Sequence, residues 1–182
     1  MHKANSVRDG FGYSSPSQAQ VSSVATFIFY GYITEVKSMW LRNIDLSEVV
    51  HASSLADVTV ALSVRITNVT GNIDPLLSRV KCRLLYISDM ILSSEDTAAL
   101  VQGMQTSVEQ VELGYDPDPV ELDWDTLLTY DGRGHCGKVC CRGKARDRYG
   151  DQLATWGETM GWSVEKNRGY GMLAAYVGIE RK

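Results

Sequence analysis

The sequence has little of what marks a secreted or membrane-spanning protein. Only 4 of its 182 residues are cysteines, too few and too unevenly placed for a disulfide-stapled scaffold. The longest apolar run, residues 24–33, has ten residues, whereas a membrane-spanning helix needs roughly 18 or more. Hydrophobic residues still make up 44% of the chain, which is enough for a core. We therefore expect a cytoplasmic globular protein without a membrane span.

Positive charge is scarce and unevenly spread. The net charge is −4, and residues 84–130 contain ten acids but no lysine or arginine. Residues 131–182 have ten bases against six acids. Because nucleic-acid binding needs a continuous basic stripe, we expect no nucleic-acid partner.

Residues suited to catalysis are also few. The three histidines, His2, His51 and His135, do not fall in a local motif with a serine or cysteine and an orienting acid. Gly132–Lys138 matches the G-x-x-x-x-G-K part of a phosphate-binding loop, but Val139 stands where a magnesium-binding hydroxyl is needed. We interpret this segment as a glycine-rich turn, and we expect a protein that is not an enzyme and has no catalytic residues.

Metal and cofactor sites are not predicted either. Cys140 and Cys141 are adjacent, so in a strand they point to opposite faces and cannot both bind one metal. We expect Cys141 and Cys82 to be buried and Cys140 to carry an exposed thiol. The acid pairs at 116 and 118 and at 123 and 125 are explained by turns and helix caps. No metal or cofactor is therefore expected.

A pair of apolar residues separated by one position recurs along the chain. The pairs are Met39 and Leu41, Val64 and Ile66, Leu85 and Ile87, Val111 and Leu113, Val139 and Cys141, then Trp162 and Val164. The second members are spaced by 25, 21, 26, 28 and 23 residues. Strand alternation puts both members of a pair on one face, and strands at such spacings bury that face by stacking as parallel coils. The pattern predicts a single repeat domain of about six coils over residues 24–182.

Helical segments are expected between these strands. The predicted segments are 47–56 capped by Ser47, 74–80 with Asp74 as cap and Pro75 in first place, 93–104 with an imperfect Ser93 and Asp96 capping pair, 123–128, and 145–160. Tyr149, Leu153, Trp156 and Met160 form a buried stripe on the last of them, and Gly103 is expected to loosen the end of the third.

The two ends depart from the repeat. Residues 1–23 are rich in polar residues and are expected to form a flexible leader. The aromatic run at 24–33 is expected to cap the first coil. A turn at 167–171 followed by a final strand over 172–179 predicts a C-terminal hairpin that closes the array and protects its edge.

Residues 36–46 resemble the strand segment of leucine-rich-repeat proteins, L-x-x-L-x-L-x-x-N-x-L, through Val36, Met39, Leu41 and Leu46. Asn43 precedes the usual asparagine position, while Asn68 and Asp89 stand at the equivalent place in the next two coils. The array is most similar to the ribonuclease-inhibitor type found in the sensing arms of NOD-like innate-immune receptors. The resemblance implies an α/β solenoid with a parallel sheet on one face and short helices on the other.

The resemblance also implies a recognition function. In that family, residues that point outward from the sheet bind a protein or another large ligand. The outward positions also follow from strand alternation alone, and the candidate ligand-binding residues are Trp40, Arg42, Arg65, Thr67, Tyr86, Ser88, Glu112 and Arg142. We expect a non-enzymatic module with a protein partner. The alternative is a structural or partly decayed fragment of a larger protein, without a ligand of its own.

Overall fold

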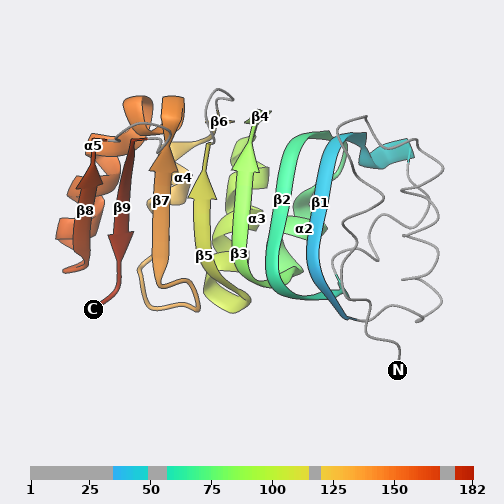
Figure 1. Ribbon diagram of the computed structural model, residues 1–182, viewed down its shortest axis with the longest axis horizontal. Coiled ribbons are helices and arrows are strands. Elements are labelled where there is room, and N and C mark those ends of the chain that lie inside the picture. The colour runs from blue at the N-terminus through green and yellow to red at the C-terminus, as the bar shows by residue number, and fades with distance from the viewer. Residues whose placement is uncertain (1–34, 49–56, 115–119, 169–174) are drawn as a thin grey trace.

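A mostly parallel sheet forms the framework of the molecule. The computed structural model describes residues 35–48, 57–114, 120–168 and 175–182. Seven strands run in the order β1-β2-β3-β5-β7-β9-β8 (Figure 1), and a small second sheet pairs β4 with β6. The strands are β1 Glu35–Asp45, β2 Thr59–Thr70, β3 Lys81–Ser88, β4 Met90–Ile91, β5 Val108–Leu113, β6 Val120–Glu121, β7 Lys138–Arg142, β8 Ser163–Asn167 and β9 Tyr176–Glu180.

The predicted apolar pairs set the register of the five parallel strands. Strands β1, β2, β3, β5 and β7 are neighbours in chain order. Their core residues form two rows across the sheet: Met39, Val64, Leu85, Val111 and Val139 in one, and Leu41, Ile66, Ile87, Leu113 and Cys141 in the other. Every one of them is buried. The predicted register is therefore confirmed for these five strands.

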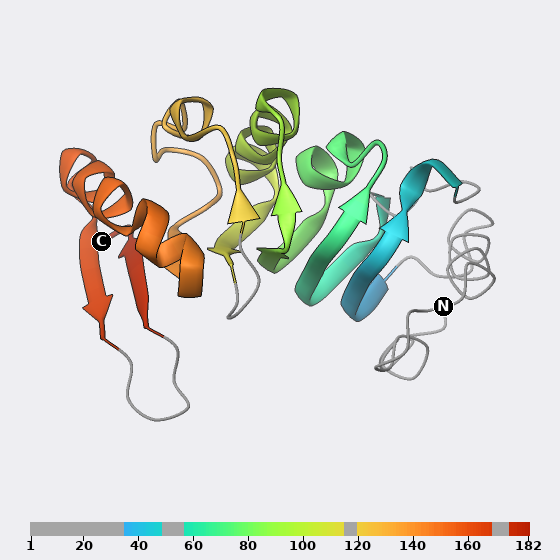
Figure 2. The ribbon, with the colours of Figure 1, turned by 90° about the horizontal axis from the view of Figure 1, so that it is seen from above.

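The segments between the strands form short helices. They are the 3-10 turn η1 Leu46–Glu48 and the helices α2 Asp74–Arg79, α3 Ser94–Thr106, α4 Trp124–Leu127 and α5 Gly143–Thr159. Figure 2 shows that α2, α3, α4 and α5 lie on the same side of the sheet. A mixed α/β fold with a parallel sheet and short helices is thus confirmed.

The helix starts follow local capping chemistry. At α3 the Asp96 amide donates to Ser93 Oγ at 3.1 Å and the Ser93 amide donates to Asp96 Oδ2 at 2.8 Å, which makes a complete capping box. Asp123 caps α4 by accepting from the Thr126 amide. Asp74 was predicted to cap α2, and this is wrong: the cap position is Ile73. Asp74 lies inside the first turn, where its negative charge still interacts favourably with the helix dipole.

Each parallel strand has a residue with left-handed backbone geometry near or just after its C-terminal end. The φ angles are 53° at Asn43, 48° at Asn68, 50° at Asp89, 75° at Gly114 and 51° at Gly143. Asparagine, aspartate and glycine are the residues that tolerate this conformation best. Asn68 Nδ2 also donates to Asn43 Oδ1 at 3.0 Å. Such a residue directly follows β3, β5 and β7, whereas in β1 and β2 it lies within the strand and the pairing continues for two more residues.

Gly103 has a packing role. It is buried in α3, and a Cβ at this position would lie 2.1 Å from the carbonyl oxygen of Leu77 in α2. The missing side chain is what lets α3 approach α2 closely, and the expected loosening of the helix end stays a prediction.

The predicted stripe on α5 forms the helix-side core near the C-terminus. Tyr149, Leu153 and Trp156 are buried, and Met160 packs against the core just after the helix ends. The Trp124 ring of α4 stacks on Tyr149 with ring centroids 5.2 Å apart. This aromatic contact joins two successive returning helices, so the buried face was predicted correctly.

The C-terminal hairpin differs in part from its prediction. Strand β9 is antiparallel to both β7 and β8 and lies between them. Val164 of β8 is therefore opposite Ile179 of β9. Strand β8 runs in the same direction as β7, but the expected sixth coil at Trp162 and Val164 does not stack directly on the fifth, because β9 inserts between the two strands. The antiparallel pairing expected of a closing hairpin is confirmed.

Several expectations fall outside the described residues. They concern the leader 1–23, the cap at 24–33, most of the helix expected over 47–56, and the acids Asp116 and Asp118. In the part of the chain that is described, no helix has the length and apolar character needed to cross a membrane.

Candidate binding surface

The candidate binding surface is the sheet face that points away from the helices, which we call the open face. All eight sequence-predicted site residues lie on it. Trp40, Arg65, Tyr86 and Glu112 are aligned in one row across β1, β2, β3 and β5. Arg42, Thr67 and Ser88 form the next row, and Arg142 pairs in register with Tyr176. The structure brings most of them into three cross-strand contacts.

The first contact is a stack of Trp40, Arg65 and Tyr86. The Arg65 Cζ atom lies 4.9 Å from the centroid of the Trp40 ring and 4.6 Å from that of the Tyr86 ring. Each cation–π contact of this kind contributes about 0.5–2 kcal/mol. Arg65 Nε is buried and has no hydrogen-bond acceptor among the described residues. The guanidinium is therefore held in place mainly by the two rings.

The second contact pairs opposite charges toward the C-terminal hairpin. Arg142 donates to Glu112 Oε1 from Nη2 at 2.8 Å and from Nε at 3.1 Å. Its Cζ atom also lies 4.9 Å from the centroid of the Tyr176 ring. The Tyr176 hydroxyl donates in turn to Glu165 of β8. Arg142 and Glu112 therefore neutralise each other.

The third contact joins two hydroxyl groups. Thr67 Oγ1 and Ser88 Oγ lie 3.0 Å apart on β2 and β3. Arg42 is exposed beside Thr67 on β1 and makes no ion pair within the described part of the chain. This row adds small polar groups next to the aromatic stack.

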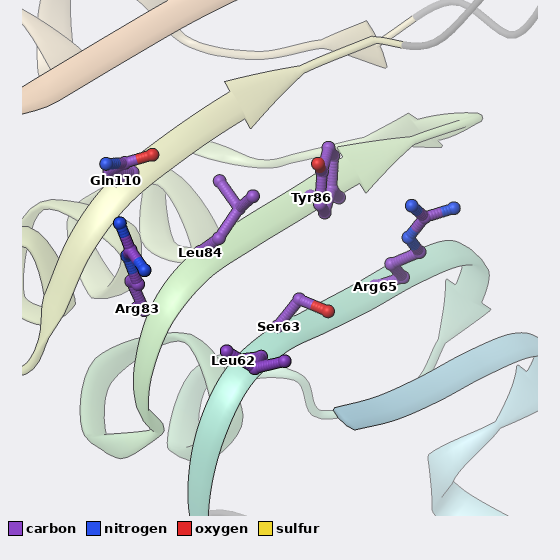
Figure 3. A pocket seen from close by; sticks show the side chains of 7 residues that line it. All are labelled: Leu62, Ser63, Arg65, Arg83, Leu84, Tyr86 and Gln110. Atoms are coloured by element: carbon purple, nitrogen blue, oxygen red, sulfur yellow. The ribbon is translucent and has the colours of Figure 1, made fainter. Parts of the chain in front are cut away.

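A bulge in β2 breaks the strand alternation and shapes a hollow. Between Val60 and Ser63, β2 has one residue more than β3, so Ala61 and Leu62 together face Arg83. Leu62 is therefore 41% exposed on the open face instead of entering the core. Next to it is a hollow of about 310 Å³ (Figure 3). Its lining residues are Leu62, Ser63, Arg65, Arg83, Leu84, Tyr86 and Gln110.

The hollow combines apolar and positively charged groups. Leu62 and Leu84 supply apolar contact, and Figure 3 shows Arg83 and Arg65 toward its opposite ends. Neither arginine has a carboxylate partner among the described residues. Burial, and after it the negative charge of Glu112, raises the pKa of Tyr86. Its hydroxyl is thus protonated at neutral pH and can donate a hydrogen bond.

The cysteine thiols are all buried, and this corrects one prediction. Cys140 was expected to be exposed, but only 3% of it is accessible. It sits on the open face opposite Gly178, and a Cβ on that glycine would approach Cys140 Sγ to 2.9 Å. The C-terminal strand β9 thus covers the Cys140 side chain. Burial raises the pKa of Cys140 and of Cys136 to about 11, so both thiols are protonated and poor nucleophiles at neutral pH. Cys82 and Cys141 are buried as predicted.

The glycine-rich segment Gly132–Lys138 is tied into the fold by its own backbone. The amides of His135, Cys136 and Gly137 donate to backbone carbonyls of residues 104–109. The carbonyl oxygens of Gly132 and Gly134 accept from Arg181, and Lys138 pairs with Glu180 at 2.9 Å. These amides and this lysine are therefore already engaged, and the interpretation of the segment as a structural turn fits their contacts.

The described residues offer no cluster suited to metal binding. Over the described ranges, no group of three or more histidine, cysteine, aspartate or glutamate side chains is placed to hold a metal ion. Asp123 accepts hydrogen bonds from Ser94 and Thr126, and these contacts lower its pKa. This acid thus stabilises the α4 start, as expected for a helix cap.

Sequence reasoning missed part of the hollow. Leu62 could not be found because a bulge is not visible in the apolar pattern. Leu84 and Gln110 lie one residue before the core pairs of β3 and β5, and extending the alternation backwards along these strands would have found them. Arg83 lies two residues before Leu85, where alternation predicts a core position, so the pattern could not have found it. Tyr176 was missed because the order of the hairpin strands was not predicted.

The chain was compared with known proteins by sequence. No protein-family model matches it, and no curated protein matches it either.

Proposed function

We propose that this chain is a non-enzymatic recognition module that binds a protein through the open face. The stack of Trp40, Arg65 and Tyr86 is the observation that carries this proposal. Tryptophan, tyrosine and arginine are the residue types most enriched at the energetic centres of protein interfaces. Here they come from three adjacent strands, so a rigid sheet holds them before any partner binds.

Rigidity is what makes the stack suited to binding. A side chain that is ordered before association loses little conformational entropy when a partner binds. Trp40 is 38% exposed although its ring already packs on Arg65. Accessible aromatic surface is thus available in a fixed position, at a place where the helices leave the sheet uncovered (Figure 2).

We propose further that the fold is a leucine-rich-repeat-like solenoid. Support comes from parallel strands that follow one another in chain order, with helices on one side. The left-handed Asn43, Asn68 and Asp89 at corresponding register positions add to it. A relation to innate-immune receptors rests on the sequence resemblance alone. The four buried, unpaired cysteines support a reducing compartment such as the cytoplasm.

Site-specific photo-crosslinking tests the binding proposal. A photoreactive amino acid is placed at Arg42 or Leu62 on the open face, and at Gln102 on the exposed side of α3 as a control. In extracts of cells that express the protein, the two open-face positions should capture the same discrete protein. That capture should be lost when Tyr86→Ala is added. Equal capture from Gln102, or none from the open face, would overturn the proposal.

The alternative function is a structural or partly decayed fragment without a ligand. The observation in its favour is that the C-terminal half of the open face pairs its own charges. Urea unfolding of the full chain, followed by tryptophan fluorescence and by circular dichroism, separates the two. Coincident, cooperative transitions support a folded module, and a broad, probe-dependent transition supports the fragment.

A further inference from the structure

The hollow on the open face has a charge arrangement that specifies the chemistry of its partner. Arg65 and Arg83 both line it, and neither forms an ion pair in the described part of the chain. By contrast, Arg142 on the same face is fully engaged with Glu112. Two cations that lack carboxylates of their own favour a ligand that brings them.

The stacking contacts of Arg65 orient its guanidinium for such a ligand. The rings of Trp40 and Tyr86 lie against its guanidinium at 4.9 and 4.6 Å. Stacking fixes the plane of the group, and a hydrogen bond to the Tyr86 side chain uses part of its donor capacity. Its Nε has no acceptor among the described residues. Because Nε itself is buried, a carboxylate would meet the outer Nη groups of this oriented guanidinium.

The spacing of the two arginines fits an extended peptide. Arg83 faces the bulge at Ala61 and Leu62, and Arg65 lies three residues beyond Leu62 along β2. At about 3.3 Å per residue this separates the two positions by roughly 10 Å along the strand. In an extended chain, side chains at i and i+4 are about 13 Å apart. The exposed Arg83 side chain can cover the small difference.

The apolar residues that line the hollow favour a ligand with an apolar side chain. Leu62, pushed outward by the bulge, and Leu84 line the hollow together with the two arginines (Figure 3). Ser63 and Gln110 add polar groups at the border. A peptide residue between two acids would thus place an apolar side chain over the leucines.

We propose that the hollow binds an extended acidic segment of a partner protein, with two carboxylates on Arg65 and Arg83 and an apolar side chain between them over Leu62 and Leu84. This inference rests on the proposed recognition function and names the chemistry of its ligand.

Fluorescence anisotropy with defined peptides tests it. The probe is a fluorescein-labelled dodecapeptide with a Glu-x-Leu-x-Glu core in a serine and glycine background. Its matched control has glutamine in place of both glutamates. The acidic peptide should bind the full chain about tenfold or more tightly than the control, because each charged hydrogen-bonded pair contributes strongly. Equal affinity for the two peptides, or no binding at millimolar concentration, would overturn the proposal.

Variants locate the binding to the hollow. Arg83→Gln removes one exposed cation and should weaken the acidic peptide about five- to tenfold. Arg65→Lys keeps the charge but loses the planar fork, and should weaken it about threefold or more. Arg133→Gln, in the exposed loop before β7, changes the net charge equally and should change affinity less than about twofold. An equal loss in Arg133→Gln would show attraction by overall charge only and sink the proposal.

Competition separates a peptide site from a general polyanion site. An oligothymidylate of the same charge as the peptide should compete poorly, since it offers no apolar side chain to Leu62 and Leu84. Competition as effective as that of unlabelled peptide would overturn the assignment to a peptide. If open-face crosslinking succeeds and the acidic peptides fail, the recognition function stands and only this inference falls.

Discussion

The two halves of the open face use the same strand positions in opposite ways. On β1, β2 and β3, Arg65 stacks between aromatic rings and lacks a carboxylate within the described residues. On β5, β7 and β9, Arg142 is bound to Glu112 and packs on Tyr176. The first half thus keeps its charge available, and the second neutralises it internally. Under the proposed function, we therefore expect recognition by the first half, which we call the binding half, while the second, which we call the closed half, closes the sheet.

The largest expected loss of stability comes from a core residue, in contrast to its neighbour on the open face. Leu85→Ala removes a fully buried side chain and should lower the free energy of unfolding by about 2–5 kcal/mol. Tyr86→Ala, the next residue on the opposite face, should cost no more than about 1.5 kcal/mol. Urea unfolding monitored by fluorescence measures both. The reverse order would mean that the two faces are wrongly assigned.

A second test concerns the closed half, where two glycines of α5 face β9. A Cβ at Gly157 would lie 2.4 Å from Ile179 Cγ2, whereas at Gly150 the nearest atom, Val177 Cγ2, is at 3.1 Å. We expect Gly157→Ala to destabilise the protein by about 1–3 kcal/mol. Gly150→Ala should stay within about 1 kcal/mol of the parent, because improved helix propensity offsets a mild contact. Thermal unfolding distinguishes the pair, and equal losses would argue against close packing of α5 on β9.

A third test compares two ion pairs that stabilise the closed half. Glu112 is 12% exposed and Arg142 28%, while Glu180, the partner of Lys138, is 58% exposed. Glu112→Gln should therefore cost about 1–2 kcal/mol, since it leaves a partly buried arginine without its carboxylate. Glu180→Gln should cost about 0.5 kcal/mol, as is usual for surface pairs. Urea titrations at low and high salt check this, and a larger loss for Glu180→Gln would contradict the comparison.

The smallest effect should come from the stack in the binding half. A double-mutant cycle of Arg65→Lys and Trp40→Leu should give a coupling free energy of about 0.5–1 kcal/mol. The control is the cycle of Arg65→Lys with Leu128→Ala, an exposed residue after α4, which should give no coupling. A stack coupling indistinguishable from that control would show that the two side chains are neighbours without an energetic contact.

Local patterns predicted the core of the parallel sheet well. The apolar pairs from Met39 to Cys141 gave the correct register, because alternation and burial act on every residue of a strand. The capping chemistry at Ser93 and Asp123 was likewise readable, since it depends on residues three positions apart. The exposure of Cys140 was predicted wrongly and the packing role of Gly103 was not predicted. Both depend on contacts with segments distant in the sequence, β9 for Cys140 and α2 for Gly103.

The sequence by itself determined the alternation that separates core from open face, and with it the eight candidate residues. Only the tertiary structure decided how those residues combine. The β2 bulge exposes Leu62, and β9 enters between β7 and β8. As a result Arg65 packs between two aromatic rings, while Arg142 forms an ion pair with Glu112. The physical reason is that alternation is a property of one strand, whereas lateral contacts depend on which strands become neighbours and in what register.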